Sequence, residues 1–219
     1  MRMRGPTVVS MRLTKLVHAC VLVEDDGARI LIDPGVFTPG FEGITGLSAI
    51  LITHQHADHV DVDRLAPLLD RNPDAALYCD EGTASVLADR GLTAEAVRDG
   101  DQLSLGVPVT VFGTNHAVIH PDIPVIPNVG YLVAGRFFHP GDSFTVPDEP
   151  VDILGLPTGA PWLKLSDAVD YLRTVAPRIA VPIHEAVLAR PEMHYGMFDK
   201  LALPGTTVSV LEPGTSTEL

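Results

Sequence analysis

Cysteines, basic residues and long apolar runs are all scarce in this 219-residue chain. Cys20 and Cys79 are the only cysteines, and each lies in an apolar stretch, which predicts buried free thiols rather than a disulfide framework. Lys and Arg number 15 against 28 Asp and Glu, and the net charge of −13 disfavours nucleic acid as a partner. Because no segment approaches the roughly 18 consecutive apolar residues of a membrane span, we expect no membrane partner either.

The N-terminal segment, residues 1–10, is basic but lacks the apolar run of about 7–15 residues that a signal peptide needs. We therefore expect a cytoplasmic protein. Met11 begins the first segment with a clear pattern. Residues 1–10 are accordingly interpreted as an N-terminal arm or a mis-annotated start, and residues 11–219 as one folded domain.

Short apolar segments alternate with amphipathic ones along the chain. The first two, 13–24 and 28–33, are joined by an Asp-Gly step that predicts a hairpin, and Ser166 is the expected N-cap of a later helix. Further strands are predicted at 49–53, 75–79, 102–105, 107–112, 129–134, 136–139, 151–154, 179–183 and 206–211, and helices at 61–70, 83–90 and 166–176. This pattern predicts an α/β fold, a single-domain four-layer αββα sandwich of two sheets between helices.

Three imidazoles and a carboxylate lie within six residues directly after the predicted strand 49–53: His54, His56, Asp58 and His59. Imidazole and carboxylate are ligands that Zn²⁺, Mn²⁺ and Fe²⁺ accept. The alternative is a solvated polar loop with incidental histidines. The length of the motif and its place at a strand end favour a metal site.

Other metal-binding residue types also follow predicted strands. His116 follows strand 107–112, Asp142 follows strand 136–139, and His184 follows strand 179–183. Gly141 would let the backbone turn so that the Asp142 carboxylate points into the site. His120 is a rival to His116 as a ligand, but His116 lies closer to its strand.

The order His-x-His-x-Asp-His, then a distant His, an Asp and a final His, resembles the signature of the metallo-β-lactamase superfamily, over about residues 16–214. The resemblance implies two divalent metal ions, with zinc expected and manganese or iron as alternatives. It also implies that Asp33 orients a ligand histidine. The implied ligands are His54, His56 and His116 for one ion and Asp58, His59 and His184 for the other, with Asp142 bridging both.

The same resemblance implies hydrolysis of an ester, lactone or related bond in a small-molecule substrate by a hydroxide that bridges the two metals. Asp58, which would help to orient that hydroxide, and Asp33 are the candidate catalytic residues. His18 is interpreted as a structural histidine on a strand face, beside Cys20. The proton donor to the leaving group stays open among His120, Tyr131, His139, His194 and Tyr195.

Two substitutions narrow the resemblance. Secreted β-lactamases of the commonest zinc class carry Cys at the position of Asp142, and diiron oxidoreductases of this fold carry Glu at the position of His56. The compact branch of the superfamily, which resembles L-ascorbate-6-phosphate lactonase, is the branch that remains. Residues 18–24, 130–132 and 138–143 of this chain resemble that branch. A phosphodiesterase of the same fold, which would need cationic groups such as Lys164, Arg136 or Arg190 near the metals, and a non-catalytic metal-binding protein are the alternatives.

Overall fold

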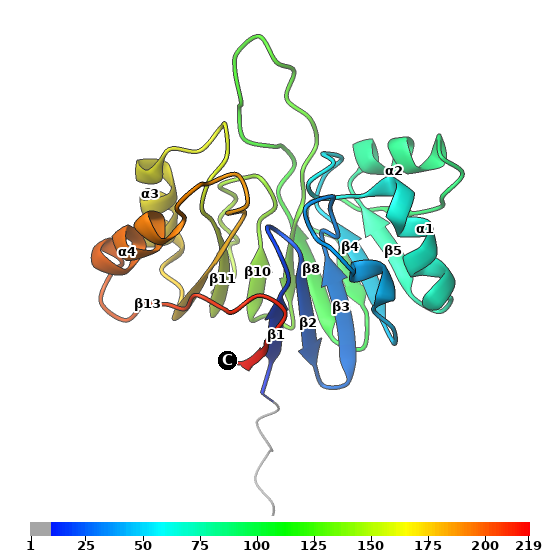
Figure 1. The fold of residues 1–219 in the computed structure, drawn as a ribbon, viewed down its shortest axis with the longest axis horizontal. Helices are drawn as coiled ribbons and strands as arrows, with labels where there is room; N and C mark the ends of the chain where they lie inside the picture. The colour runs from blue at the N-terminus through cyan, green and yellow to red at the C-terminus, as the bar shows by residue number, and fades with distance from the viewer. Residues whose placement is uncertain (1–9) are drawn as a thin grey trace, which may run out of the picture.

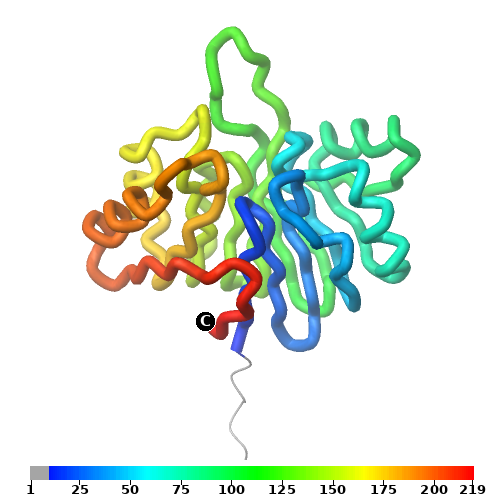
Figure 2. The backbone as a smooth tube through the Cα atoms, in the orientation of Figure 1, coloured from blue at the N-terminus to red at the C-terminus, as the bar shows by residue number. Residues whose placement is uncertain are grey.

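Two seven-stranded sheets pack face to face, with helices covering both outer faces, in the computed structural model, which describes residues 10–219 (Figures 1 and 2). The first sheet has the order β14-β1-β2-β3-β4-β5-β6 and the second β13-β12-β11-β10-β9-β8-β7. The predicted four-layer αββα sandwich is therefore confirmed. The arm predicted at 1–10 lies, apart from Ser10, outside the described residues.

The strands of the first sheet are β1 (Arg12–Lys15), β2 (Val21–Asp25), β3 (Ala28–Ile32), β4 (Ala49–Ile52), β5 (Ala76–Cys79), β6 (Glu95–Ala96) and β14 (Ser216–Glu218). Those of the second sheet are β7 (Gln102–Ser104), β8 (Pro108–Phe112), β9 (Gly130–Val133), β10 (Phe137–His139), β11 (Ile153–Pro157), β12 (Ile179–Ile183) and β13 (Thr207–Val208). The helices are α1 (Val62–Arg71), α2 (Glu81–Ala88), α3 (Leu165–Val175) and α4 (Glu192–Leu201), with a short 3₁₀ turn, η1 (Phe41–Gly43).

The core has three apolar layers that match this arrangement. Inward-facing residues of both sheets, such as Val23 and Val181, form the central layer between the sheets. Cys20 and Cys79, both buried and free as predicted, belong to the layer beneath α1 and α2. Leu172 belongs to the layer beneath α3 and α4. Among the described residues, no helix combines the length and the apolar character that crossing a membrane requires.

Two sequence predictions of secondary structure are wrong, and helix α4 and the short strands β6 and β14 were not predicted. The strand predicted at 13–24 divides into β1 and β2, because His18 adopts a left-handed conformation with φ of 61° and turns the chain. Helix α3 begins at Leu165, and Asp167 accepts a hydrogen bond from the Lys164 N–H, so Ser166 lies inside the helix instead of capping it. Helix α4 was not predicted, because Phe198 is its only fully buried residue and an apolar stripe is missing.

The loops that follow β4, β8, β10 and β12 meet at one edge of the sandwich. They come from both sheets, so the site that they form straddles the interface between the sheets. The loop between β8 and β9 is the longest of them and projects beyond the rest of the molecule (green in Figure 1).

Candidate metal centre

The first sheet contributes four of the predicted ligands from one tight loop. Strand β4 is completely buried and ends at Ile52, after which the chain turns so that the His59 N–H donates to the His56 carbonyl at 2.9 Å. The loop ends at Asp61, whose side chain caps α1 by accepting from the Arg64 N–H. The rigid strand and the capped helix thus fix both ends of the ligand loop.

The second sheet contributes the other three ligands. His116, Asp142 and His184 lie beyond β8, β10 and β12 respectively, and all three are buried. Asp142 is aimed by Gly141, which has φ of 62°, and by Asn128, whose side-chain oxygen accepts from the Asp142 N–H at 2.9 Å. The structure therefore brings together all seven residues that the sequence singled out as metal ligands.

One group of side chains that could hold a metal ion consists of His54, His56, His116 and Asp142, whose ligand atoms all lie within 4.8 Å of one another. The Nε2 atom of His54 is 3.0 Å from Nδ1 of His56. Oδ2 of Asp142 is 3.3 Å from Nε2 of His116 and 3.9 Å from Nε2 of His54. Three imidazoles and one carboxylate oxygen thus converge on one point.

The second such group consists of His18, Asp58, His59 and His184. The other oxygen of Asp142, Oδ1, is 3.1 Å from Nε2 of His59 and 3.2 Å from Nε2 of His184. Nε2 of His184 is also 3.5 Å from Oδ2 of Asp58. Asp142 therefore lies between the two groups, with one oxygen toward each.

The donor atoms fit divalent metal ions. Four inward-facing polar atoms, Nε2 of His59, His116 and His184 and Oδ1 of Asp142, are buried without a hydrogen-bond partner. Nδ1 of His116 is 2.5 Å from the Ala117 carbonyl, and Nδ1 of His184 is 2.7 Å from the Gly159 carbonyl. Because a carbonyl only accepts, each Nδ1 carries a proton, and in the neutral form of each ring Nε2 is free as a ligand. Buried polar atoms without partners are costly, and metal coordination would remove that cost.

Asp33 lies outside the ligand groups and holds them in place. Its carboxylate accepts from the Thr53 N–H and hydroxyl, both at 2.7 Å, and lies 2.6 Å from Nδ1 of His59. With Nδ1 bound in this way, the His59 ring turns Nε2 toward Asp142. The residue that the resemblance singled out for orienting a histidine is therefore placed beside His59.

His18 belongs to the site, contrary to its interpretation as a structural histidine on a strand face. Its Nδ1 accepts from the Ala186 N–H at 3.2 Å, so the neutral ring carries its proton on Nε2 and donates to Oδ2 of Asp58 at 3.1 Å. This tautomer makes His18 a residue that positions Asp58 rather than a metal ligand. The sequence carried one signal that His18 is not part of a strand. Lys15 and His18 are polar residues close together, and they interrupt the apolar pattern that a strand would show. Lys15 itself is buried and paired with Glu185.

The five residues considered as proton donors do not reach the cavity over the ligands. Tyr131 is buried and donates to the Ile52 carbonyl, and His139 is buried with Nε2 toward the Ala19 carbonyl. His120 is exposed and its Nδ1 accepts from the Asp122 N–H, which leaves His116 as the histidine of this loop that reaches Asp142. His194 and Tyr195 lie on α4. Among the described residues, none of the five lines the cavity over the ligands.

Burial and neighbouring charges lower the pKa of one ligand histidine, His54, and raise the pKa of two others, His59 and His184. Burial lowers the pKa of His54 well below its ordinary value. Burial opposes protonation of His59 and His184 and is the largest single influence on each, but the nearby carboxylates together outweigh it. These carboxylates are Asp142 and Asp33 at His59, and Asp142 and Asp58 at His184. The pKa of His59 is thereby raised well above its ordinary value, and that of His184 is raised to about 9. Metal binding must displace these protons.

We expect the metal-free protein to lose stability as the pH rises from 6.5 to 9. The pKa of His184 is raised from 6.5 to about 9 in the folded chain, so its stabilising contribution is complete below pH 6.5 and is lost as the pH rises through 9. The loss is on the order of 2–3 kcal/mol of unfolding free energy. Urea unfolding of the metal-free protein across this range measures it, and the zinc-loaded protein, in which metal replaces the protons, is the control. If the stability of the metal-free protein stayed constant or rose over this pH range, the raised pKa of His184 would be contradicted.

A cavity of about 410 Å³ lies over the ligands. His56, Asp58, His116, Asp142 and His184 line its floor. Trp162 also lines it, and its Nε1 donates to Oδ2 of Asp142 at 2.9 Å. The ligands are thus open to a small molecule from this side.

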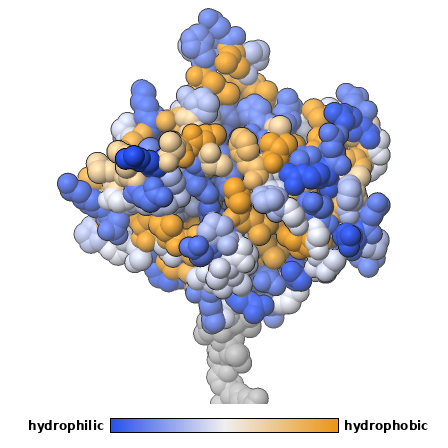
Figure 3. Space-filling view, in the orientation of Figure 1, coloured by the Kyte–Doolittle hydropathy of each residue, from blue (hydrophilic) through white to orange (hydrophobic). Residues whose placement is uncertain are grey.

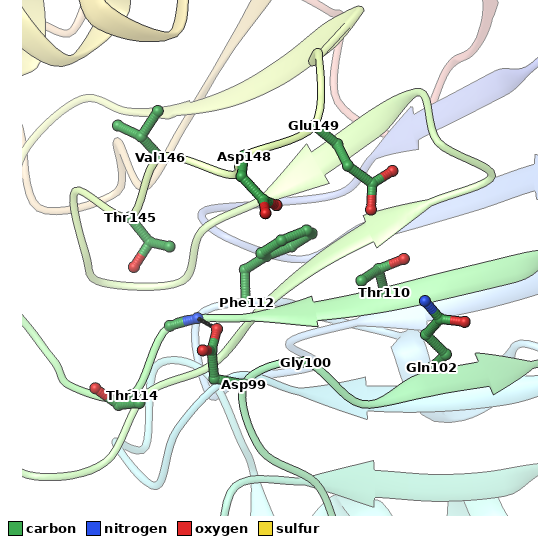
Figure 4. A pocket seen from close by; sticks show the side chains of 11 residues that line it. Asp99, Gly100, Gln102, Thr110, Phe112, Thr114, Thr145, Val146, Asp148 and Glu149 are labelled. Carbon is green, nitrogen blue, oxygen red and sulfur yellow. Dashed lines mark hydrogen bonds between the residues drawn. The ribbon is translucent and has the colours of Figure 1, made fainter.

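A larger cavity, of about 510 Å³, lies beside β7 and β8. Its carboxylates, Asp99, Asp148 and Glu149, surround the ring of Phe112 (Figure 4). Among the described residues that line it there is no histidine or cysteine. Size alone therefore does not identify the functional site, and the metal-type ligands lie in the smaller cavity.

A family model described as the β-lactamase superfamily domain matches residues 12–184. The chain belongs to this superfamily. Protein Rv0786c of Mycobacterium tuberculosis is 56% identical over 185 residues, which cover 82% of this chain and 86% of that protein. A UPF0173 metal-dependent hydrolase of Aeropyrum pernix is 27% identical over 239 residues, which cover 94% of this chain and 97% of that protein.

Among solved structures, Igni18, a metallo hydrolase from Ignicoccus hospitalis, has the same fold, with a TM-score of 0.74 at 21% identity, covering 96% of this chain and 98% of that one. The resemblance to the superfamily and its fold is therefore confirmed, and the chain is a member of a metal-dependent hydrolase family. The narrower resemblance to L-ascorbate-6-phosphate lactonase stays a prediction.

Proposed function

We propose that this superfamily member is a two-metal hydrolase that cleaves an ester or lactone bond in a small molecule. The observation that carries the proposal is Asp142, which directs Oδ1 toward His59 and His184 and Oδ2 toward His54 and His116. A carboxylate between two sets of imidazoles suits a bridging ligand of two ions. Zinc is the expected metal, because tetrahedral sites of this kind accept imidazole and carboxylate ligands.

Two bound ions would polarise the substrate oxygen and make water a nucleophile at neutral pH. The other tasks fall to side chains. Asp33 fixes the ring of His59, and Trp162 fixes the carboxylate of Asp142. Asp58, which accepts a hydrogen bond from Nε2 of His18 and is half-buried in the cavity, would orient the attacking water.

The reaction is a hydrolysis that needs no other reactant. The oxygen of water forms a bond to the acyl carbon, and the bond between that carbon and the leaving oxygen breaks with its electron pair. The leaving oxygen takes up a proton, so an ester gives an acid and an alcohol, and a lactone gives a hydroxy acid.

A phosphodiester substrate is less well supported. Among the described residues, no Lys or Arg lines the cavity over the ligands. Arg136 lies at the start of β10, where it donates to the Leu219 carbonyl, and Arg190 precedes α4. Lys164 lines a neighbouring cavity beyond Trp162. None of the three is placed to hold a phosphate over the metals.

Metal analysis coupled to a substrate panel tests the proposed function. We expect about two zinc ions per chain and turnover of aryl esters or lactones that is lost on chelation and restored by zinc, because the ions supply both the nucleophile and the polarisation. Bis(aryl) phosphodiesters in the same panel test the alternative. Stoichiometric metal without turnover of any substrate would instead identify a non-catalytic metal-binding protein.

A further inference from the structure

The walls of the cavity over the ligands are apolar, in contrast to its floor. The wall residues are Val36, Phe37, Ala57, Ile119, Pro161, Trp162 and Val187. They come from loops of both sheets, so apolar side chains face the ligands from several sides. A site built in this way holds its substrate through hydrocarbon contact and orients it with the few polar groups of the floor.

Several of these wall residues are exposed although they are large and hydrophobic. Val36, Phe37 and Val187 are 45%, 44% and 47% exposed. The loop after His116 adds the exposed Val118, Ile123 and Val125. Three of the eleven large hydrophobic residues exposed in the described part of the chain thus line this cavity, and three more lie on the loop that follows one of its lining histidines, His116. In Figure 3, hydrophobic side chains gather at the base of the projecting loop, and its tip is hydrophilic. Such a concentration marks a binding surface rather than scattered exposure.

The ring of Phe37 packs against the ring of His18, a residue of the site. The ring of His18 meets it edge to face, with centroids 5.1 Å apart, and His18 itself is held by Asp58 and the Ala186 N–H. The aromatic wall is therefore connected to the ligand set, and it needs little reordering when a ligand binds.

Outside the metals, the side chains around the cavity disfavour an anionic substrate. The chain carries a net charge of −13, and the cavity floor includes Asp58 and Asp142. Among the described residues that line this cavity, there is no Lys or Arg that could pair with a phosphate or a carboxylate. Outside the metals, an anion would therefore find no partner, whereas a neutral group would bind without this penalty.

We propose that the substrate is an uncharged ester or lactone with a hydrocarbon group, which lies against Val36, Phe37 and Val187 while the scissile carbonyl faces Asp142. The hydrolysis rests on the proposed function, but hydrocarbon binding does not. Each methylene that leaves water gains roughly 0.8 kcal/mol, so affinity rises about fourfold per methylene until the walls are covered.

Trp162 gives a direct measure of binding, because it is the only tryptophan of the chain and lines this cavity. The full-length protein, metal-free and zinc-loaded, is titrated with neutral N-methyl alkanamides from propyl to hexyl and with alkyl phosphates of the same lengths. Indole fluorescence reports the dissociation constants. We expect the amides to bind about fourfold more tightly per added methylene in both forms, and to bind the metal-free form more tightly than the phosphates do.

Val187→Ser and Val146→Ser form a matched pair. Both residues are valines of nearly equal exposure, 47% and 46%, but Val146 lines the larger cavity beside β7 and β8. We expect Val187→Ser to weaken amide binding by about five- to tenfold and Val146→Ser to leave it unchanged. Equal effects of the two variants, binding without length dependence, or tighter binding of the phosphates to metal-free protein would overturn the proposal. So would co-sedimentation with phosphatidylcholine vesicles without an amide-induced change in fluorescence, since the apolar rim would then be a lipid-docking surface.

The two proposals can fail separately. Length-dependent amide binding with no turnover of any ester or lactone would refute the proposed hydrolysis and keep the apolar site. Turnover that does not depend on acyl length, together with no amide binding, would refute the apolar site and keep the hydrolysis.

Discussion

Asp142→Asn is expected to lower ester or lactone turnover by about a thousandfold, because a metal ion would supply several kcal/mol of transition-state charge stabilisation that its loss removes. The amide keeps the shape of the side chain but removes the negative charge that faces both histidine groups. Bound metal should fall to one ion per chain or fewer, because the two ions lose the ligand between them. Metal content of the purified variant and its kcat/KM, measured with saturating zinc, check both expectations.

The control for this variant is Asp148→Asn. It makes the same chemical change at an exposed carboxylate of the larger cavity (Figure 4). We expect metal content and turnover equal to those of the unmodified protein. If Asp148→Asn lost activity and Asp142→Asn kept both metal and activity, the functional site would have to be moved to the carboxylate cavity.

The candidate site could be predicted from the sequence to the extent that its residues lie at strand ends. His54, His56, Asp58 and His59 lie within six residues of one another, so their proximity needed no knowledge of the fold. His116, Asp142 and His184 could be added because loops at the ends of neighbouring strands meet at one edge of a sheet.

Two residues of the site could not be placed in this way. His18 reaches Asp58 only because a left-handed turn separates β1 from β2, and the Ala186 N–H that fixes its tautomer lies 168 residues further along the chain. Trp162 reaches Asp142 from a loop without regular periodicity. Both depend on tertiary contacts that no local pattern reports.

The secondary structure likewise contains elements that the sequence predicted and elements that it did not. Strands such as β4 and β12 were predicted because buried strands are continuous apolar runs, and β12 has exactly the predicted bounds, Ile179–Ile183. Helix α4 was missed because Met193 and Met197 face solvent and leave Phe198 as its anchor. Periodicity reports how much of an element is buried, so an element with one buried residue leaves little trace in the sequence.

Gly35→Ala is expected to have the largest effect of any Gly→Ala substitution in the described part of the chain. A Cβ atom at this position would lie 1.9 Å from the carbonyl oxygen of Asp58 and 2.6 Å from the backbone nitrogen of His59. Both are backbone atoms of the ligand loop, and the Val36 N–H donates to the Ala57 carbonyl at 2.8 Å, so the two loops cannot separate without breaking hydrogen bonds. We expect a loss of roughly 3 kcal/mol or more in unfolding free energy, at the upper end for overpacking.

Gly43→Ala provides the control, because Gly43 belongs to the same Gly- and Pro-rich loop and a Cβ there would meet nothing within 4 Å. Its unfolding free energy, measured in urea beside that of Gly35→Ala, should match that of the unmodified protein within about 0.5 kcal/mol. If Gly35→Ala folds, the methyl group must have displaced Asp58 and His59, and zinc affinity should fall with it. A stable variant with full zinc affinity would mean that the close approach of these loops does not hold the ligands in place.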